Sequence, residues 1–204
     1  ETAHRLNAQA ANALLKTLEE PVPGRYLLLV THQAAALPAT IRSRCQRIEV
    51  PLPEAAQARQ WLAEQGLPQD AARQLLALAG GNPGLALQWQ AQGGKTLLDA
   101  VQKQLDAMGK GQVAASTLAR DWLSDELTAL RLVFAAGIAG QLAKTWVLGE
   151  KSPPKPAQAA LRLQDWIDDI NRLRLSLSQP LRHDLGLAGL MHEWHRLQND
   201  FRQD

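Results

Sequence analysis

This sequence of 204 residues contains a single cysteine and few aromatic residues, and neither sign of charge is in large excess. A single cysteine excludes an internal disulfide framework and fits a reducing compartment. No run approaches the roughly 20 apolar residues that a membrane span needs, and no basic-then-apolar targeting signal opens the chain. Lys and Arg number 22 against 20 Asp and Glu, so the net charge of +2 gives no general case for nucleic-acid binding. We therefore expect a cytoplasmic protein with no membrane partner.

The first 50 residues mix helical and strand patterns, and because they open without a Met we expect a fragment that lacks an upstream part. "NAQAANALLKTLEEP" predicts a helix that Asn7 caps and Pro21 ends, and "AAALPATIRSR" predicts a second helix. The apolar run at 26–31 and the alternating "RIEV" at 47–50 predict strands, the first of them buried on both faces as in a parallel sheet. Helix, strand, helix and strand in this order are typical of the end of an α/β domain.

Only helical patterns follow Pro51 and Pro53. Two helices are predicted over 54–65 and 69–79, and a third begins where Asn82 can act as N-cap ahead of a proline. The expected core face of the first helix carries Ala58, Trp61 and Leu62. Wide apolar stripes then predict four longer helices around 97–108, 127–146, 163–177 and 187–201.

The predicted fold is therefore mainly α, with three parts. Residues 1–50 form the truncated end of an α/β core, 51–93 a small helical bundle, and 94–204 a larger helical domain. Because the sheet of the first part lacks its leading strands, we expect residues 1–50 to be only partly folded.

Three stretches resemble a phosphate-binding, a metal-binding and a nucleophilic site, but none has the residues that such a site needs. "GGKT" at 93–96 lacks the earlier glycine and the preceding strand of a phosphate-binding loop, since Trp89 stands where that glycine should be. His192 and His195 are three residues apart, whereas the zinc-protease helix places its histidines four apart, so we expect ordinary helix histidines. Cys45 has no evident base and is expected to pack rather than react. The sequence thus predicts no cofactor, no metal and no catalytic group with which this chain could act as a free-standing enzyme.

Three arginines crowd the segment ahead of Glu49, at positions 42, 44 and 47. A guanidinium is always charged, and its planar fork matches phosphate oxygens in pairs. An arginine at the end of a helix can project across a subunit boundary and neutralise a neighbour's γ-phosphate. The alternative is a solvated surface cluster, and spacing alone does not separate the two.

The order and wording of the segment 12–45 resemble a known family. "NALLKTLEEP", an apolar stretch ending in Thr31, and "LPATIRSRC" together resemble the clamp-loader branch of the AAA+ ATPases. The resemblance implies the end of an AAA+ module over 1–50, a lid domain over 51–93 and a collar domain over 94–204 that joins subunits in a ring. It further implies that Arg44 of the Ser-Arg-Cys motif is an arginine finger in trans, supported by Ser43, Cys45 and Thr31.

Three departures from the family pattern indicate a subunit that does not hydrolyse ATP. Glu1 holds the metal-side position of the Walker B pair, but Thr2 replaces the glutamate that would polarise water, and a hydroxyl is no base near neutral pH. The lid stretch "GGNPGLAL" carries no basic residue to sense a γ-phosphate, and His32 follows Thr31. The resemblance therefore implies a stator subunit of the bacterial replicative clamp loader.

The partners that this resemblance implies are the ATP-binding gamma or tau subunits, the delta subunit, primer-template DNA and, indirectly, the beta sliding clamp. A zinc module is implied upstream of this chain. Arg42 and Arg47 have no role in the motif and are expected to be surface or DNA-facing charges.

Two alternatives stay open. One is an ATP-hydrolysing subunit of the gamma or tau type, whose phosphate loop would lie upstream; Thr2 and the lid stretch speak against it. The other is a helical scaffold unrelated to nucleotides, in which Arg42, Arg44 and Arg47 could all be exchanged for Lys without consequence.

Overall fold

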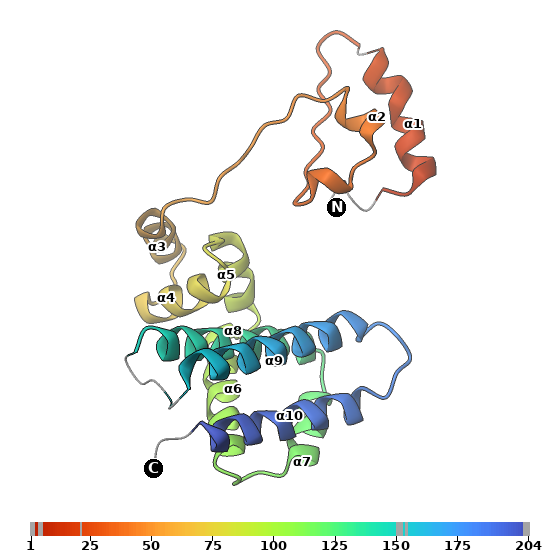
Figure 1. Ribbon diagram of the computed structural model, residues 1–204. Coiled ribbons are helices and arrows are strands. Elements are labelled where there is room, and N and C mark those ends of the chain that lie inside the picture. The colour runs from red at the N-terminus through yellow and green to blue at the C-terminus, as the bar shows by residue number, and fades with distance from the viewer. Residues whose placement is uncertain (1–2, 4–5, 21, 150–152, 154, 202–204) are drawn as a thin grey trace. The chain divides into compact units, whose positions relative to one another are not determined.

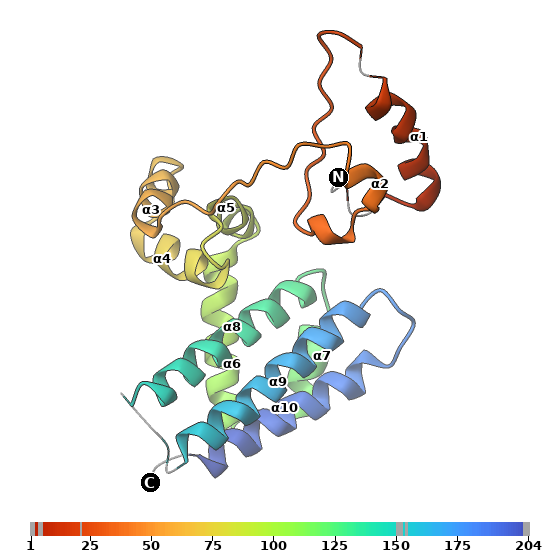
Figure 2. The same cartoon turned by 45° about the horizontal axis from the view of Figure 1, so that its top comes forward.

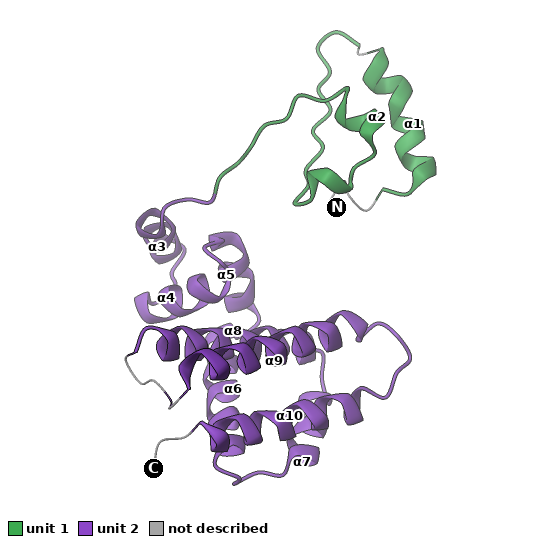
Figure 3. Cartoon of the chain, in the orientation of Figure 1, with its two compact units in different colours: residues 1–51 green, residues 52–204 purple. Residues whose placement is uncertain are grey.

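The computed structural model describes residues 3, 6–20, 22–149, 153 and 155–201, and it confirms a mainly α fold. The chain divides into two compact units, residues 1–51 and residues 52–204 (Figure 3). The further division at residue 93 stays a prediction. No helix among the described residues is both long and apolar enough to cross a membrane.

Unit 1 is built on the helix α1, which spans Ala8–Glu19. The predicted cap is confirmed, since the Asn7 side chain accepts a hydrogen bond of 2.8 Å from the Ala10 backbone N–H. The second predicted helix is broken into the 3-10 turn η2, Ala34–Ala36, and the short α2, Ala39–Arg42. The break falls at Leu37 because a residue before proline is driven to extended backbone, and Leu37 has φ −71° and ψ 143°.

The two predicted strands of unit 1 are wrong as strands, since no strand forms among the residues that the structure describes. Segments 26–31 and 47–50 lack regular secondary structure, and Tyr26 is 92% and Val50 90% exposed. A strand needs a neighbour to accept and donate its ladder hydrogen bonds. Here the Ala3 N–H donates to the Val30 carbonyl over 2.8 Å, but the described residues supply no adjacent strand. The expected burial of these apolar side chains is therefore absent as well.

Unit 2 opens with three short helices that pack on one another (Figure 1). They are α3, Ala55–Glu64; α4, Gln69–Leu78; and α5, Pro83–Ala91. Asn82 caps α5 as predicted, accepting from the Leu85 backbone N–H at 3.0 Å. Ala58 and Leu62 are buried as predicted, but Trp61 is 39% exposed, so the predicted core face was one residue too wide.

The larger part of unit 2 is a bundle in which α8 and α9 lie side by side and α10 packs against α6, α7 and α9 (Figures 1 and 2). Its helices are α6, Gly94–Gly109; α7, Ala115–Trp122; α8, Thr128–Val147; α9, Pro156–Ser176; and α10, His183–Asp200. The four long helices match the predicted apolar stripes. The short helix α7 was not predicted separately.

Buried tryptophans join the helices of the bundle by hydrogen bonds as well as by packing. The indole N–H of Trp194 donates to the Leu105 carbonyl on α6 at 2.9 Å, and that of Trp166 donates to the Leu190 carbonyl on α10 at 2.8 Å. The two rings also contact each other, with centroids 4.8 Å apart. A buried indole N–H that finds a carbonyl avoids the cost of an unpaired polar group, so each ring can fill the core without penalty.

Candidate functional site

The candidate site lies in unit 1, at the turn that follows α2. Arg44 is fixed by the backbone of that turn, where its N–H donates to the Ile41 carbonyl at 3.1 Å. Ile41 is fully buried and anchors α2, and α2 packs against α1. The backbone of Arg44 is thus positioned by a small apolar contact, while its side chain stays 36% exposed.

The guanidinium of Arg44 is held by partners from both helices. Its Nε donates to Glu19 Oε1 at 2.8 Å, and its Nη2 lies 2.5 Å from the same oxygen. Its Nη1 donates to the Thr40 carbonyl at 3.0 Å and to Ser43 Oγ at 3.3 Å. These contacts use at most four of the five N–H groups of an arginine.

The ion pair between Arg44 and Glu19 is partly exposed to solvent. The Glu19 side chain is 49% exposed, and pairs at such positions contribute roughly 0–1 kcal/mol. A phosphate oxygen can therefore reach the unused N–H of the guanidinium from solvent without displacing Glu19. Chemically, the turn can offer an oriented cation to an anion supplied from outside the chain.

The residues expected to support the motif take distinct places. Ser43 Oγ donates to the Thr40 carbonyl at 3.1 Å, so its hydroxyl closes the turn that carries Arg44. Cys45 is half-buried and not in a disulfide, but it borders no sheet among the described residues. Thr31 Oγ1 accepts from the Gln33 backbone N–H at 3.0 Å, which begins the turn into η2.

The other two arginines of the cluster point to different partners. Arg42 Nη1 lies 3.5 Å from the Ala35 carbonyl, and Arg47 Nη2 lies 2.6 Å from Glu49 Oε1. Both side chains are exposed, as expected for surface charges. Glu1 and Thr2, the two positions assigned to the Walker B pair, lie outside the described residues.

The "GGKT" stretch has a structural explanation in place of phosphate binding. It follows the helix α5 and starts α6, and Lys95 Nζ contacts the two carboxylate oxygens of Asp99 at 2.6 and 2.8 Å. That hydrogen bond to Asp99 raises the pKa of Lys95, with Asp70 adding to the effect. The ammonium group of Lys95 is therefore ion-paired with carboxylates of its own unit.

Two of the three histidines of α10, His192 and His195, have different surroundings. His195 Nδ1 lies 3.0 Å from the Met108 carbonyl at the end of α6, and its Nε2 lies 3.0 Å from the Asn199 side-chain amide. His192 is exposed. No group of three or more potential metal ligands comes together within the part of the chain that the structure describes.

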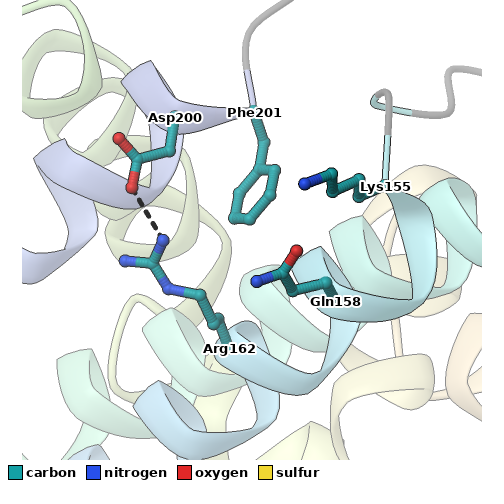
Figure 4. A pocket seen from close by; sticks show the side chains of 5 residues that line it. All are labelled: Lys155, Gln158, Arg162, Asp200 and Phe201. Carbon is teal, nitrogen blue, oxygen red and sulfur yellow. Dashed lines mark hydrogen bonds and ion pairs between the residues drawn. The ribbon is translucent and has the colours of Figure 1, made fainter.

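A pocket of about 260 Å³ lies between the start of α9 and the end of α10, and Figure 4 shows the side chains that line it. Two cations line it, Lys155 and Arg162. Arg162 donates to Asp200 at 2.7 Å and to Glu193 at 2.7 Å and lies over the ring of Phe201. The hydrogen bond to Asp200, then that to Glu193, raises the pKa of Arg162. Since two carboxylates of the same unit meet the charge of Arg162, this guanidinium is a weaker candidate for an anion than that of Arg44.

One residue of the site was missed from the sequence. Glu19 lies 25 positions before Arg44, and no local spacing links the two. A signal was present all the same: Glu19 is an acidic residue in the last turn of α1, where the helix dipole disfavours a negative charge. An acidic side chain at that place suggests a cationic partner elsewhere in the fold.

Comparison with known proteins adds to this geometry. A family model described as DNA polymerase III, delta subunit, matches residues 1–54, the segment that carries α1, α2 and Arg44. The class of protein that this chain resembles is thus a subunit of that polymerase assembly, and the resemblance expected from residues 12–45 is confirmed.

The particular subunit follows from the curated relatives. The DNA polymerase III subunit delta′ of Pseudomonas aeruginosa is 36% identical over 217 residues, covering 97% of this chain and 65% of that protein. The subunit delta′ of Haemophilus influenzae is 44% identical over 92 residues, 45% of this chain and 28% of its own. A tau subunit from Bacillus subtilis is 47% identical over 49 residues, 24% of this chain and 9% of its own. The chain is similar to delta′ over nearly its whole length, and it spans less than two thirds of these relatives.

Proposed function

We propose that this chain acts as the delta′ subunit of a bacterial DNA polymerase III clamp loader. In that role it is a stator that does not hydrolyse ATP and that donates Arg44 as an arginine finger to the ATP site of an adjacent gamma or tau subunit. Its proposed partners are those ATPase subunits, the delta subunit, primer-template DNA and, through the complex, the sliding clamp.

The observation that carries this proposal is the state of Arg44. Its backbone is fixed by a hydrogen-bonded turn, while its guanidinium is partly exposed and paired only at the surface. The similarity to delta′ proteins supplies the partner that would hold the nucleotide. An arginine tied into a buried network would not be able to leave its own chain.

The mechanism follows from charge. A cation fixed beside a phosphoryl group stabilises the negative charge that grows on it in the transition state more than the charge of bound ATP. Arginine fingers contribute about 10³–10⁵ in rate, roughly 4–7 kcal/mol of activation free energy. The ATPase subunit keeps its own metal and water-activating groups, and this chain supplies only the guanidinium.

The test is the DNA-stimulated ATPase rate of a reconstituted complex in which the ATPase subunit next to this chain is the only one competent to hydrolyse. Arg44→Ala should lower that rate by about 10³-fold or more while the complex still assembles. Arg47→Ala is the matched control, because it removes an exposed arginine from the same segment. An unchanged rate with Arg44→Ala in an assembled complex contradicts the proposal.

A second candidate function has one observation in its favour, the match of a 49-residue stretch to a tau subunit. On that alternative the full-length protein binds and hydrolyses ATP itself. Equilibrium binding of ATP to the isolated full-length protein separates the two, since a stator that only donates an arginine needs no nucleotide of its own.

A further inference from the structure

Glu19 is the principal partner of the Arg44 side chain, and its position is unusual for an acidic residue. It lies in the last turn of α1, where the exposed carbonyls give the helix end a partial negative charge. A carboxylate there is disfavoured by the helix itself. The ion pair with Arg44 offsets this effect, since Nε and Nη2 of Arg44 both face one carboxylate oxygen of Glu19.

The contacts of Arg44 are divided between the edges of its guanidinium. Glu19 takes the side edge formed by Nε and Nη2. The Thr40 carbonyl and Ser43 Oγ accept from Nη1. At most four of five N–H groups are used, so an Nη2 N–H remains for an anion, and the weak contact to Ser43 at 3.3 Å can yield a second one. The end of the fork is thus the part left for a phosphate.

A free arginine side chain carries a large rotamer entropy that must be lost when it binds a phosphate. Because Glu19 and Thr40 already hold the guanidinium from two sides, part of that entropy is lost before the phosphate arrives. Charged groups set in place in advance are the ones that lower a barrier most effectively.

We propose that Glu19 is a positioning residue for the arginine finger: it holds the side edge of the Arg44 guanidinium so that the end of the fork faces the nucleotide of the adjacent subunit. The inference rests on the proposed function of Arg44. It assigns a role to the "LEEP" stretch at 18–21 through Glu19, a residue that itself touches no nucleotide.

The test uses the same complex with a single hydrolysing subunit and measures single-turnover ATP hydrolysis. Glu19→Ala should lower the rate about three- to thirtyfold, less than Arg44→Ala, because the guanidinium remains but loses its orientation. Glu20→Ala is the matched control, since Glu20 is the adjacent exposed carboxylate and is not the partner of Arg44. Both variants should keep the thermal midpoint of the protein, since both side chains are exposed and the pair that Glu19 makes contributes only about 0–1 kcal/mol.

The double variant Glu19→Ala with Arg44→Ala separates positioning from any other role. If Glu19 acts through Arg44, the double variant hydrolyses ATP at the rate of Arg44→Ala alone. A further loss in the double variant shows that Glu19 acts elsewhere and overturns the inference. A faster rate with Glu19→Ala alone shows that the ion pair restrains the finger, which also overturns it. If Arg44→Ala itself has no effect, the proposed function has failed.

Discussion

At the scale of single residues, Gly94 shows how one missing side chain permits a tight connection. It is the first residue of α6, and a Cβ added there would lie 2.7 Å from the carbonyl oxygen of Trp89 on α5. The neighbour is backbone, so it cannot swing away as a side chain could. In "GGKT", Gly94 therefore serves the close approach of two helices, and Gly93 serves the left-handed turn before α6, where its φ is +74°.

We predict that Gly94→Ala destabilises unit 2 by about 1–3 kcal/mol, the usual cost of forcing extra volume into a packed site. Urea unfolding followed by circular dichroism at 222 nm measures it. The control is Gly189→Ala on α10, where an added Cβ meets nothing within 4 Å. Ala at that helical position should raise the free energy of unfolding by about 0.5–1 kcal/mol. Equal effects of the two substitutions would contradict this account.

At the scale of elements, the start of α8 is organised by Asp125. Its two carboxylate oxygens contact Nη1 and Nη2 of Arg131 at 2.5 and 2.7 Å, and Oδ1 also accepts from the Leu127 backbone N–H at 2.8 Å. The hydrogen bond from Arg131, the largest cause, lowers the pKa of Asp125 below its usual 3.8. One carboxylate thus satisfies a helix end and an arginine together.

We predict that Asp125→Asn lowers the free energy of unfolding of unit 2 by about 1 kcal/mol at neutral pH, since the amide oxygen can still accept from the Leu127 N–H but the ion pair with Arg131 is lost. Because the folded pKa is lowered, the contribution is fully present above pH 3.8 and is lost as the pH falls through the folded value. The difference between wild type and variant, measured by thermal unfolding from pH 7 to pH 2, should therefore shrink in the acid range. A difference that persists unchanged at pH 2 would show that the charge of Asp125 is not its cause.

The elements also show what sequence can and cannot reveal. The caps at Asn7 and Asn82 and the four long stripes of unit 2 were predicted, because each depends on residues a few positions apart. The strand at 26–31 was predicted wrongly, since its apolar run specifies burial but cannot supply the neighbouring strand. Arg44 could be singled out from its motif, whereas its partner Glu19 depends on how α1 packs on α2 and was found only from the fold.

At the scale of the whole molecule, the two units differ in how much they bury. The buried apolar side chains described in unit 1 are Ala3, Ala11, Leu37 and Ile41. Unit 2 has a continuous core that runs from Ala58 to Leu197. Its large aromatic side chains, each at most 9% exposed, are Trp89, Trp122, Phe134, Trp146, Trp166 and Trp194. Since apolar burial is the main stabilising term, unit 2 should hold nearly all of the stability.

We predict that a fragment of residues 52–204 folds alone, with a helical spectrum and one cooperative urea transition. A fragment of residues 1–51 should show little amide protection, because it buries too little surface to offset the conformational entropy of its chain. Hydrogen exchange of the two fragments, compared with the full chain, checks both statements. Loss of cooperative unfolding in the larger fragment would mean that its core depends on unit 1.

The most direct measurement of the central claim is single-turnover ATP hydrolysis by the neighbouring subunit when Arg44 is replaced by Lys. A lysine keeps the charge but lacks the planar fork, so a finger that binds phosphate with two N–H groups should lose at least tenfold in rate. Arg42→Lys and Arg47→Lys in the same assembled complex should hydrolyse at the wild-type rate. Equal rates for all three replacements would contradict the account, because a surface charge is all that Arg44 would then supply.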